Sequence, residues 1–183
     1  MNNRPEKKPR FVMDLAGSFF AVTILIFVAF YLIWTVSHGG AGSGRAGLAV
    51  GEVAPEITAA GWVNGEPPTD LTGKVVVVNA WATWCHLCRE KSPELVEIYN
   101  QFADRDDVIF IGLTTNDASV MPAIKKFLEE PGITWPNGYG ATESLQKFQA
   151  DYIPSVWVVS RSGKIAWNYD SPGDLESAIR KQL

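Results

Sequence analysis

Histidine and cysteine are scarce in this chain, which has two residues of each type among its 183. A structural zinc site needs four ligands, drawn mostly from these two residue types. The cysteines are Cys85 and Cys88, with His86 between them, whereas His38 lies far upstream at the end of an apolar segment. A complete zinc site would need carboxylates or a second chain, and we therefore predict that no metal is bound.

Clusters of basic residues are absent from the larger, C-terminal part of the chain. Residues 51–183 contain 11 Lys and Arg against 18 Asp and Glu, so this part is acidic. Nucleic-acid-binding domains usually present a basic patch, and the charge therefore argues against a nucleic-acid partner. The sequence also has no internal repeat and no second domain boundary, which predicts one domain over residues 51–183.

Charged residues are missing from residues 15–36. As a helix these 22 residues would be about 33 Å long, enough to cross a hydrocarbon core of roughly 30 Å. Tyr31 and Trp34 lie near the far end, as interfacial anchors do. Basic residues precede the segment, so we expect residues 1–14 in the cytoplasm, a single-pass helix over 15–36, and the remainder on the extracytoplasmic, or periplasmic, side of the cytoplasmic membrane.

A cleaved signal peptide is the competing interpretation of this segment. Its apolar region is usually about 7–15 residues long and is followed by a small-x-small cleavage site. Residues 41–43 have the small-x-small pattern of such a site. The greater length of the uncharged segment favours an uncleaved anchor, and no cysteine lies nearby to carry a lipid. Residues 37–50 contain five glycines and are predicted to form a flexible tether.

The stretch from Val75 to Cys88 organises the rest of the domain. Its run of four valines is too short and too β-branched for a helix and predicts a strand buried on both faces. Residues 79–83 then leave the sheet, and apolar residues at helical spacing follow the cysteines, at positions 95, 98, 99 and 102. We therefore expect Cys85 and Cys88 at the N-terminal end of a helix.

This location favours thiol–disulfide exchange. Unpaired N–H groups and the helix dipole stabilise a thiolate, and thiol pKa values in such Cys-x-x-Cys motifs fall to roughly 3.5–7.5. We expect Cys85 to be exposed and to act as the nucleophile, and Cys88 to resolve the mixed disulfide. A purely structural disulfide is the alternative in an oxidising compartment, although so small a loop would restrain the unfolded chain little.

The remaining pattern predicts an α/β domain. The apolar run from Asp107 to Leu113 should pair in parallel with the valine strand through a βαβ crossover. Further strands are expected over residues 155–159 and, antiparallel, around 165–169, with a short strand or hairpin ahead of the valines that turns at Asn64-Gly65. Helices are expected over Val120–Glu130, over 143–150 after a Thr142 cap, and after an Asp174 cap.

The segments VVVVNAWATWCHLCREKSPEL, YIPSVWVV, APEI and FLEEPGITWP resemble the membrane-anchored thioredoxin-like proteins of the TlpA/ResA group over residues 51–183. The resemblance implies a thioredoxin-like fold, a central mixed sheet flanked by helices. It also implies disulfide exchange with exported cysteine-containing proteins, often as a reductase in cytochrome c maturation, together with a membrane electron-transfer partner. No cofactor is implied beyond the redox-active disulfide Cys85–Cys88.

Site residues follow from this resemblance by position. Cys85 matches the family's nucleophile, Cys88 its resolving thiol, and Pro154 a proline that is cis in the family, an isomer that X–Pro bonds adopt at modest cost. Ile153 would offer its backbone to an extended substrate by β-strand addition. Trp84 is expected to pack beside the nucleophile at the substrate-binding surface.

Two positions depart from the family pattern and leave the proton acceptor of Cys88 undetermined. Asn79 stands where thioredoxin has a buried aspartate, and Lys91 stands where many anchored relatives have a glutamate. Glu90 is one position earlier, a rotation of about 100° along the helix. Our hypothesis is that Lys91, if it faces the site, favours the thiolates by charge, and that protonated His86 could do the same.

Three other functions fit the residues less well. A thiol peroxidase would need a Pro-x-x-x-Thr-x-x-Cys motif, but Val78 and Ala82 occupy the corresponding positions. A copper-delivery metallochaperone of similar fold would need two cysteines with three residues between them and a distal histidine, whereas two residues separate Cys85 from Cys88 and no histidine follows His86. A non-catalytic binding domain would keep its biological role after Cys85→Ser.

Overall fold

The computed structural model describes residues 24, 26–30 and 47–183. The chain divides into two units, residues 1–41 and 42–183, and the folded domain belongs to the second unit. The predicted cytoplasmic segment and most of the predicted membrane helix and tether lie outside the described residues. Within the described part of the chain, no helix combines the length and the apolarity needed to cross a membrane.

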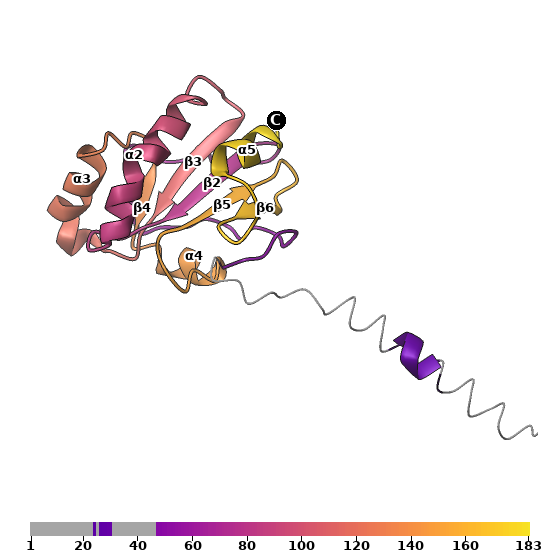
Figure 1. Cartoon of the computed structure of the whole chain (residues 1–183). Helices are drawn as coiled ribbons and strands as arrows, with labels where there is room; N and C mark the ends of the chain where they lie inside the picture. Colours follow the sequence, from indigo (N-terminus) through magenta and orange to yellow (C-terminus); the bar gives the residue numbers. More distant parts are fainter. Residues whose placement is uncertain (1–23, 25, 31–46) are drawn as a thin grey trace, which may run out of the picture. The chain divides into compact units, whose positions relative to one another are not determined.

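A six-stranded mixed sheet forms the centre of the domain, with the strand order β1-β4-β3-β2-β5-β6 (Figure 1). The strands are β1 (Gly61–Val63), β2 (Val75–Ala80), β3 (Val108–Leu113), β4 (Asn137–Tyr139), β5 (Ser155–Val159) and β6 (Ile165–Asn168). The helices are α2 (His86–Asn100), α3 (Met121–Glu129), α4 (Thr142–Lys147) and α5 (Leu175–Arg180), and a 3₁₀ turn covers Ala118–Val120.

The four-valine strand is the middle of this sheet, as predicted. β2 pairs in parallel with β3, with Val75 opposite Val108. On its other edge β2 pairs antiparallel with β5, with Val78 opposite Trp157. All six residues of β2 are buried. The arrangement confirms the predicted α/β class, the βαβ crossover through α2, and the antiparallel β5–β6 pair.

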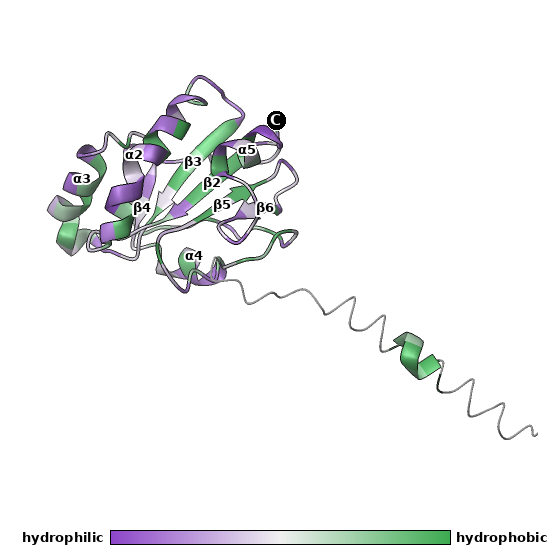
Figure 2. Ribbon diagram, in the orientation of Figure 1, coloured by the Kyte–Doolittle hydropathy of each residue, from purple (hydrophilic) through white to green (hydrophobic). Residues whose placement is uncertain are grey.

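Two apolar cores flank the sheet, and alternate valines of β2 face alternate cores. Val75 and Val77 pack with residues of α2, α3 and α5, whereas Val76 and Val78 pack with α4 and the segment around Leu48. Figure 2 shows the resulting apolar strands β2, β3 and β5 between more polar helix surfaces. Because both faces are covered, a continuous apolar run is stable in the centre of this sheet.

The short strand predicted before the valines is present as β1, which ends just before Asn64-Gly65 and pairs antiparallel with β4. One local prediction was wrong. Thr142 is not a cap: it is the first residue of α4, and Ala141 occupies the cap position without a side-chain hydrogen bond. By contrast, Asp174 does cap α5, since its Oδ1 accepts the N–H of Ser177 at 2.8 Å.

The packed domain begins before the predicted boundary at residue 51. Leu48 is buried, its N–H donates to the carbonyl of Phe148 at 3.0 Å, and its own carbonyl accepts from Asn168 Nδ2 at 2.9 Å. At Gly47 the backbone has φ +83°, and a Cβ there would lie 2.4 Å from the Phe148 oxygen. Residues 47 and 48, predicted as tether, are therefore part of the fold.

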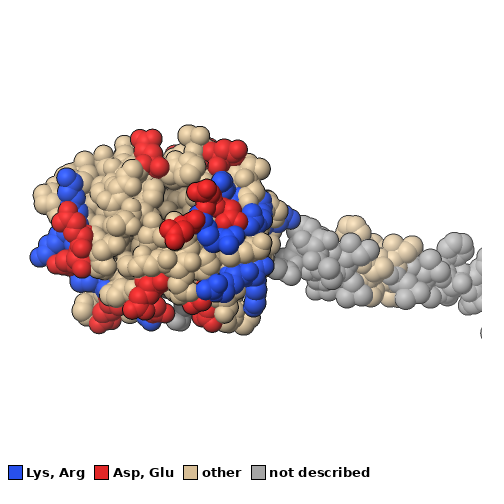
Figure 3. Space-filling model, turned by 90° about the horizontal axis from the view of Figure 1, so that it is seen from above, with Lys and Arg blue, Asp and Glu red and all other residues tan. Residues whose placement is uncertain are grey.

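Charges of both signs share the surface. Acidic and basic side chains lie next to one another on the face seen in Figure 3. Asp107 illustrates this mixing, because its carboxylate accepts hydrogen bonds from Arg105 at 2.8 Å and from Arg161 at 2.7 Å.

Candidate active site

The cysteines lie where the end of β2 meets the start of α2. The chain leaves β2 at Ala80, passes through buried Trp81, and begins α2 at His86 with Cys85 as the N-cap residue. The Sγ of Cys85 accepts a hydrogen bond from the N–H of Cys88 at 3.1 Å. This is the donor arrangement expected of a helix N-terminus, and it confirms the predicted location of the pair.

Cys85 and Cys88 form a disulfide, with their Cα atoms 5.3 Å apart. Their residues are 5% and 4% exposed, so the prediction that Cys85 is the exposed cysteine was wrong. Both belong to the core cluster that contains Trp81, against which Ile153 also packs. The two cysteines differ instead in helical position: Cys85 caps α2 and Cys88 lies inside its first turn.

The peptide bond between Ile153 and Pro154 is cis, as the resemblance implied. Pro154 and Cys88 line the same small cavity, so the proline loop faces the cysteine pair although 66 positions separate the two residues. The structure thus brings together Cys85, Cys88, Ile153 and Pro154 from the two halves of the domain.

Trp84 lies on the surface next to Cys85 in the sequence and does not pack into the core. Its side chain is 73% exposed, and it lines a groove of about 380 Å³ with Trp81, Tyr152 and Ile153. Leu87, one residue before Cys88, is also half exposed. The surface next to the disulfide is therefore apolar and accessible, which suits contact with a protein substrate better than internal support.

Polar contacts that the sequence did not indicate fix the loop before Cys85. The N–H of Thr83 donates to Asn116 Oδ1 at 2.9 Å, and its carbonyl accepts from Arg89 Nη2 at 3.3 Å. Asn116 follows β3, which is parallel to β2. The loops at the C-terminal ends of neighbouring parallel strands lie together. The position of Asn116 just after β3 could therefore have predicted its contact with the loop before Cys85.

His86 and Glu90 lie on the solvent side of α2. His86 Nε2 and Glu90 Oε1 are 3.1 Å apart, and these side chains are 85% and 58% exposed. An ion pair this exposed contributes little and is screened by salt. Glu90 thus points toward His86 on the surface, while the influence of His86 on the thiols stays a hypothesis.

Asn79 is buried behind Cys88, whereas the side chain of Lys91 is 57% exposed. Both line the cavity behind Cys88, which has a volume of about 30 Å³ and is also lined by Pro154. The Oδ1 of Asn79 is buried and has no hydrogen-bond partner among the described residues. The Nζ of Lys91 donates to Glu94 Oε2 at 2.9 Å. Lys91 thus borders the cavity while its charged group pairs with Glu94, and its effect on the thiolates stays a hypothesis.

Comparison with known proteins identifies the fold and the chemistry. Residues 49–183 match the Redoxin family. This chain belongs to the Redoxin family. Thiol-disulfide oxidoreductase YkuV of Bacillus subtilis is 28% identical over 134 residues, which cover 70% of this chain and 90% of YkuV. Thiol-disulfide oxidoreductase ResA of Bacillus thuringiensis is 29% identical over 100 residues, 52% of this chain and 54% of ResA, so that match spans about half of ResA.

Solved structures agree with this assignment. The thioredoxin domain of a thiol-disulfide oxidoreductase from Bacteroides vulgatus has a TM-score of 0.58 and 26% identity, covering 73% of this chain and 97% of that one. A thiol:disulfide interchange protein from a Bacteroides species has a TM-score of 0.61 and 28% identity, covering 73% and 90%. The Redoxin domain thus has a thioredoxin-like fold.

The chemistry available to this Redoxin domain is thiol–disulfide exchange through Cys85 and Cys88. The disulfide is present, the Sγ of Cys85 accepts a hydrogen bond from an N–H of the first helical turn, and the adjacent residues Trp84 and Leu87 expose apolar side chains. Within residues 24, 26–30 and 47–183, no group of three or more His, Cys, Asp or Glu side chains is placed to hold a metal ion. The Cys85–Cys88 disulfide is the redox-active group of the domain.

Proposed function

We propose that this Redoxin protein is an extracytoplasmic thiol–disulfide oxidoreductase, anchored in the cytoplasmic membrane by residues 15–36. It exchanges disulfides with exported cysteine-containing proteins, and it acts as a reductase in cytochrome c maturation. The observation that carries the exchange activity is the Cys85–Cys88 disulfide at the N-terminus of α2, facing cis-Pro154. The location is supported by the uncharged, 22-residue apolar segment and its basic flank.

In the first step, the thiolate of reduced Cys85 attacks a disulfide sulfur of the substrate. A bond forms between Cys85 Sγ and that sulfur, the substrate's own S–S bond breaks, and the second substrate sulfur leaves as a thiolate and takes up a proton. The N–H of Cys88, which reaches Cys85 Sγ at 3.1 Å in the disulfide form, is placed to stabilise the Cys85 thiolate.

In the second step, the thiolate of Cys88 attacks Cys85 Sγ. The Cys85–Cys88 bond forms and the mixed disulfide breaks, so the substrate leaves reduced by two electrons. A membrane electron-transfer partner then returns two electrons to the Redoxin disulfide. Because Cys88 lies only one helical turn from Cys85, resolution needs no rearrangement of the fold.

The substrate is an extended, partly apolar segment. The groove lined by Trp84, Tyr152 and Ile153 includes the residues directly before Cys85 and Pro154 and offers aromatic and aliphatic contacts. Ile153 precedes β5, whose first residue is Ser155, and its backbone can add a substrate strand in the manner of β-augmentation. Hydrogen bonds to backbone would let the site accept many sequences around a cysteine.

A trapping experiment tests the exchange activity. Cys88→Ser removes the resolving thiol, so exported proteins from the host should accumulate as mixed disulfides with Cys85, visible as reducible adducts. Cys85→Ser, the matched control, should trap none. A Cys85→Ser chain that retains full biological function would contradict a catalytic role and favour a non-catalytic binding domain.

The direction of electron flow and the location need separate measurements. Equilibration of the pair with glutathione should give a reduction potential toward the reducing end of the range of roughly −270 to −120 mV known for such pairs. A potential near the oxidising end would make the protein an oxidant instead. Reporter fusions after residues 14 and 50 should be active on opposite sides of the membrane if residues 15–36 are an anchor.

A further inference from the structure

Cys88 must lose its proton before it can attack Cys85, and no carboxylate among the described residues lines the cavity behind it. The titratable side chains that do line this cavity are those of Lys91 and Tyr169. The pKa of Tyr169 is raised to about 12, first by burial and then by the negative charge of Glu94, so its hydroxyl stays protonated. The Tyr169 hydroxyl is therefore not ready to accept the thiol proton at neutral pH.

Asn79 provides a hydrogen-bond acceptor inside the cavity. Its residue is 8% exposed, and its Oδ1 has no partner among the described residues. The nearby Ser92 hydroxyl is already engaged, because it donates to the carbonyl of Cys88 at 2.7 Å. A cavity of about 30 Å³ can hold one water molecule, and a buried polar acceptor in such a place is normally satisfied by one. A water bound to Asn79 Oδ1 would therefore occupy the cavity that Cys88 also lines.

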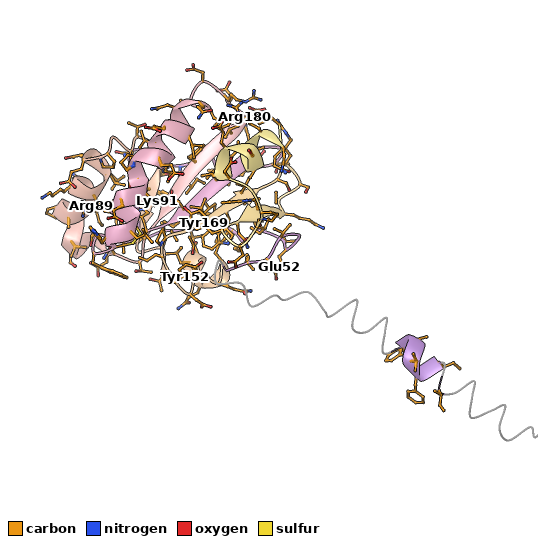
Figure 4. All side chains as sticks on the ribbon, viewed as in Figure 1. Glu52, Arg89, Lys91, Tyr152, Tyr169 and Arg180 are labelled. Atoms are coloured by element: carbon orange, nitrogen blue, oxygen red, sulfur yellow. A yellow bond between two sulfur atoms is a disulfide. The ribbon has the colours of Figure 1, made fainter. Side chains whose placement is uncertain are left out.

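The cavity adjoins a larger groove at the surface. Lys91, Leu95 and Tyr169 line both the cavity and a groove of about 230 Å³ that also contains Glu94 and Asp174. In Figure 4, Lys91 on α2 and Tyr169 after β6 lie next to each other at this boundary. The cavity and the groove are therefore adjacent, and a path from Cys88 to solvent through the groove passes these three side chains.

Glu94 is the carboxylate placed to act at this exit. It lines the groove from α2, and Lys91 holds it through a 2.9 Å hydrogen bond. The other carboxylate in the groove, Asp174, is occupied as the cap of α5, where it accepts from both the N–H and the hydroxyl of Ser177. His86 and Glu90 pair with each other on the surface and line neither space.

We propose that Glu94 accepts the proton of Cys88 through a water held by Asn79, and that Lys91 is the residue that positions Glu94. This proposal rests on the proposed oxidoreductase function and deepens its second step. The Cys88 S–H passes its proton to the water, which passes a proton on to the Glu94 carboxylate. The electron pair left on Cys88 forms the bond to Cys85, and the substrate sulfur departs with the electron pair of the broken mixed disulfide.

The two steps can be observed separately with an aromatic disulfide whose released thiolate is coloured. Reduced full-length protein in detergent should release one equivalent of colour when Cys85 attacks and a second when Cys88 resolves the mixed disulfide. In Glu94→Gln, we expect the second release to be about 10- to 100-fold slower near pH 6–7 and the first to be unchanged. The deficit should disappear at alkaline pH, where Cys88 ionises without assistance.

Further variants separate proton transfer from structural damage. Asn79→Asp puts a carboxylate directly into the cavity, so in combination with Glu94→Gln it should restore the second release. Lys91→Met should slow the second release less than Glu94→Gln does. Glu97→Gln, an exposed carboxylate on the same helix that lines neither space, is the matched control and should behave as the parent protein.

The outcomes distinguish this proposal from the one it rests on. A second release in Glu94→Gln that keeps the parent rate and pH profile would overturn the role of Glu94 and leave the exchange function intact. An equal slowing of both releases at every pH, without rescue by Asn79→Asp, would also overturn it, because that pattern indicates a structural effect. Failure to observe even the first release would contradict the oxidoreductase function itself.

Discussion

The indole N–H of Trp81 donates a hydrogen bond to Asn137 Oδ1 at 3.0 Å, and both residues are buried. The bond ties the loop that leads to Cys85 to β4, on the far side of β3. Asn137 in turn donates from Nδ2 to the carbonyl of Trp135 at 2.8 Å. The short strand β4 therefore supports the active-site loop through one polar side chain, although it contributes no residue to the disulfide itself.

Replacement of Asn137 by Ala should destabilise the domain. The Trp81 donor would be left buried without its partner, which costs about 1–3 kcal/mol. The measurement is the free energy of unfolding from urea titration, with exposed Asn100→Ala as the control expected to change it by less than about 0.5 kcal/mol. Equal effects of the two substitutions would show that the Trp81 contact contributes nothing.

Gly112 should tolerate no side chain. A Cβ at this position of β3 would lie 1.8 Å from Asn137 Oδ1, so Gly112→Ala must displace the amide and break its bond to Trp81. We expect a loss of about 1–3 kcal/mol of unfolding free energy, as for other overpacked interiors. Since both changes remove the same bond, Gly112→Ala and Asn137→Ala should be less than additive in the double variant. Full additivity would contradict the shared mechanism.

Apolar periodicity predicted the parts of this fold that depend on burial. The valines of β2, the apolar run of β3 and the segment after Pro154 are buried strands because each sequence can bury both faces. β4 was missed because its sequence, Asn137-Gly138-Tyr139, has no such run. It is a strand because Gly112 allows Asn137 to approach β3 closely, a pairwise fit that no pattern within one segment reveals.

The site was predictable in its location but not in its exposure. The order of strand, cysteine pair and helix placed Cys85 at the helix N-terminus, and the resemblance identified cis-Pro154. Which side chains cover the disulfide depends on loops from distant parts of the chain. For this reason Cys85 was predicted to be exposed although it is buried.

Asp107 should make stability fall at acid pH. Hydrogen bonds from Arg105 and then Arg161 hold the pKa of its carboxyl well below its usual range. A carboxylate whose pKa is lower in the folded than in the unfolded chain stabilises the fold at pH values above its unfolded pKa of about 3.9. This contribution is lost as the pH falls below that value. Asp107→Asn should therefore lower the melting temperature at pH 7, and its difference from the parent should shrink below about pH 4. A constant difference across this range would contradict the linkage.

Tyr169 should make stability fall at alkaline pH. Burial, followed by the charge of Glu94, raises its pKa to about 12. A tyrosine whose pKa is higher in the folded than in the unfolded chain contributes its full stabilisation at pH values below its unfolded pKa of about 10. This contribution is lost as the pH rises from about 10 toward 12. Tyrosinate absorbance should show one late step that vanishes in Tyr169→Phe and in denaturant. If the late step persists in Tyr169→Phe, it belongs to another tyrosine.

Trp84 should matter for substrates and not for folding. Because its side chain is 73% exposed, Trp84→Ala should change the free energy of unfolding by less than about 0.5 kcal/mol. A tryptophan that becomes buried against a partner commonly contributes about 2 kcal/mol or more to binding, which corresponds to about 30-fold in affinity.

Capture by the Cys88→Ser trap provides the measurement for Trp84. With Trp84→Ala added, capture of exported proteins should fall by about this factor, while reaction of Cys85 with a small aromatic disulfide should keep its rate. Val53→Ala is the control, since Val53 is 71% exposed and does not line the groove. Unchanged capture in the Trp84 variant would place the substrate contact elsewhere, and a matching fall with the small disulfide would mean that Trp84 acts on the reactivity of Cys85 instead.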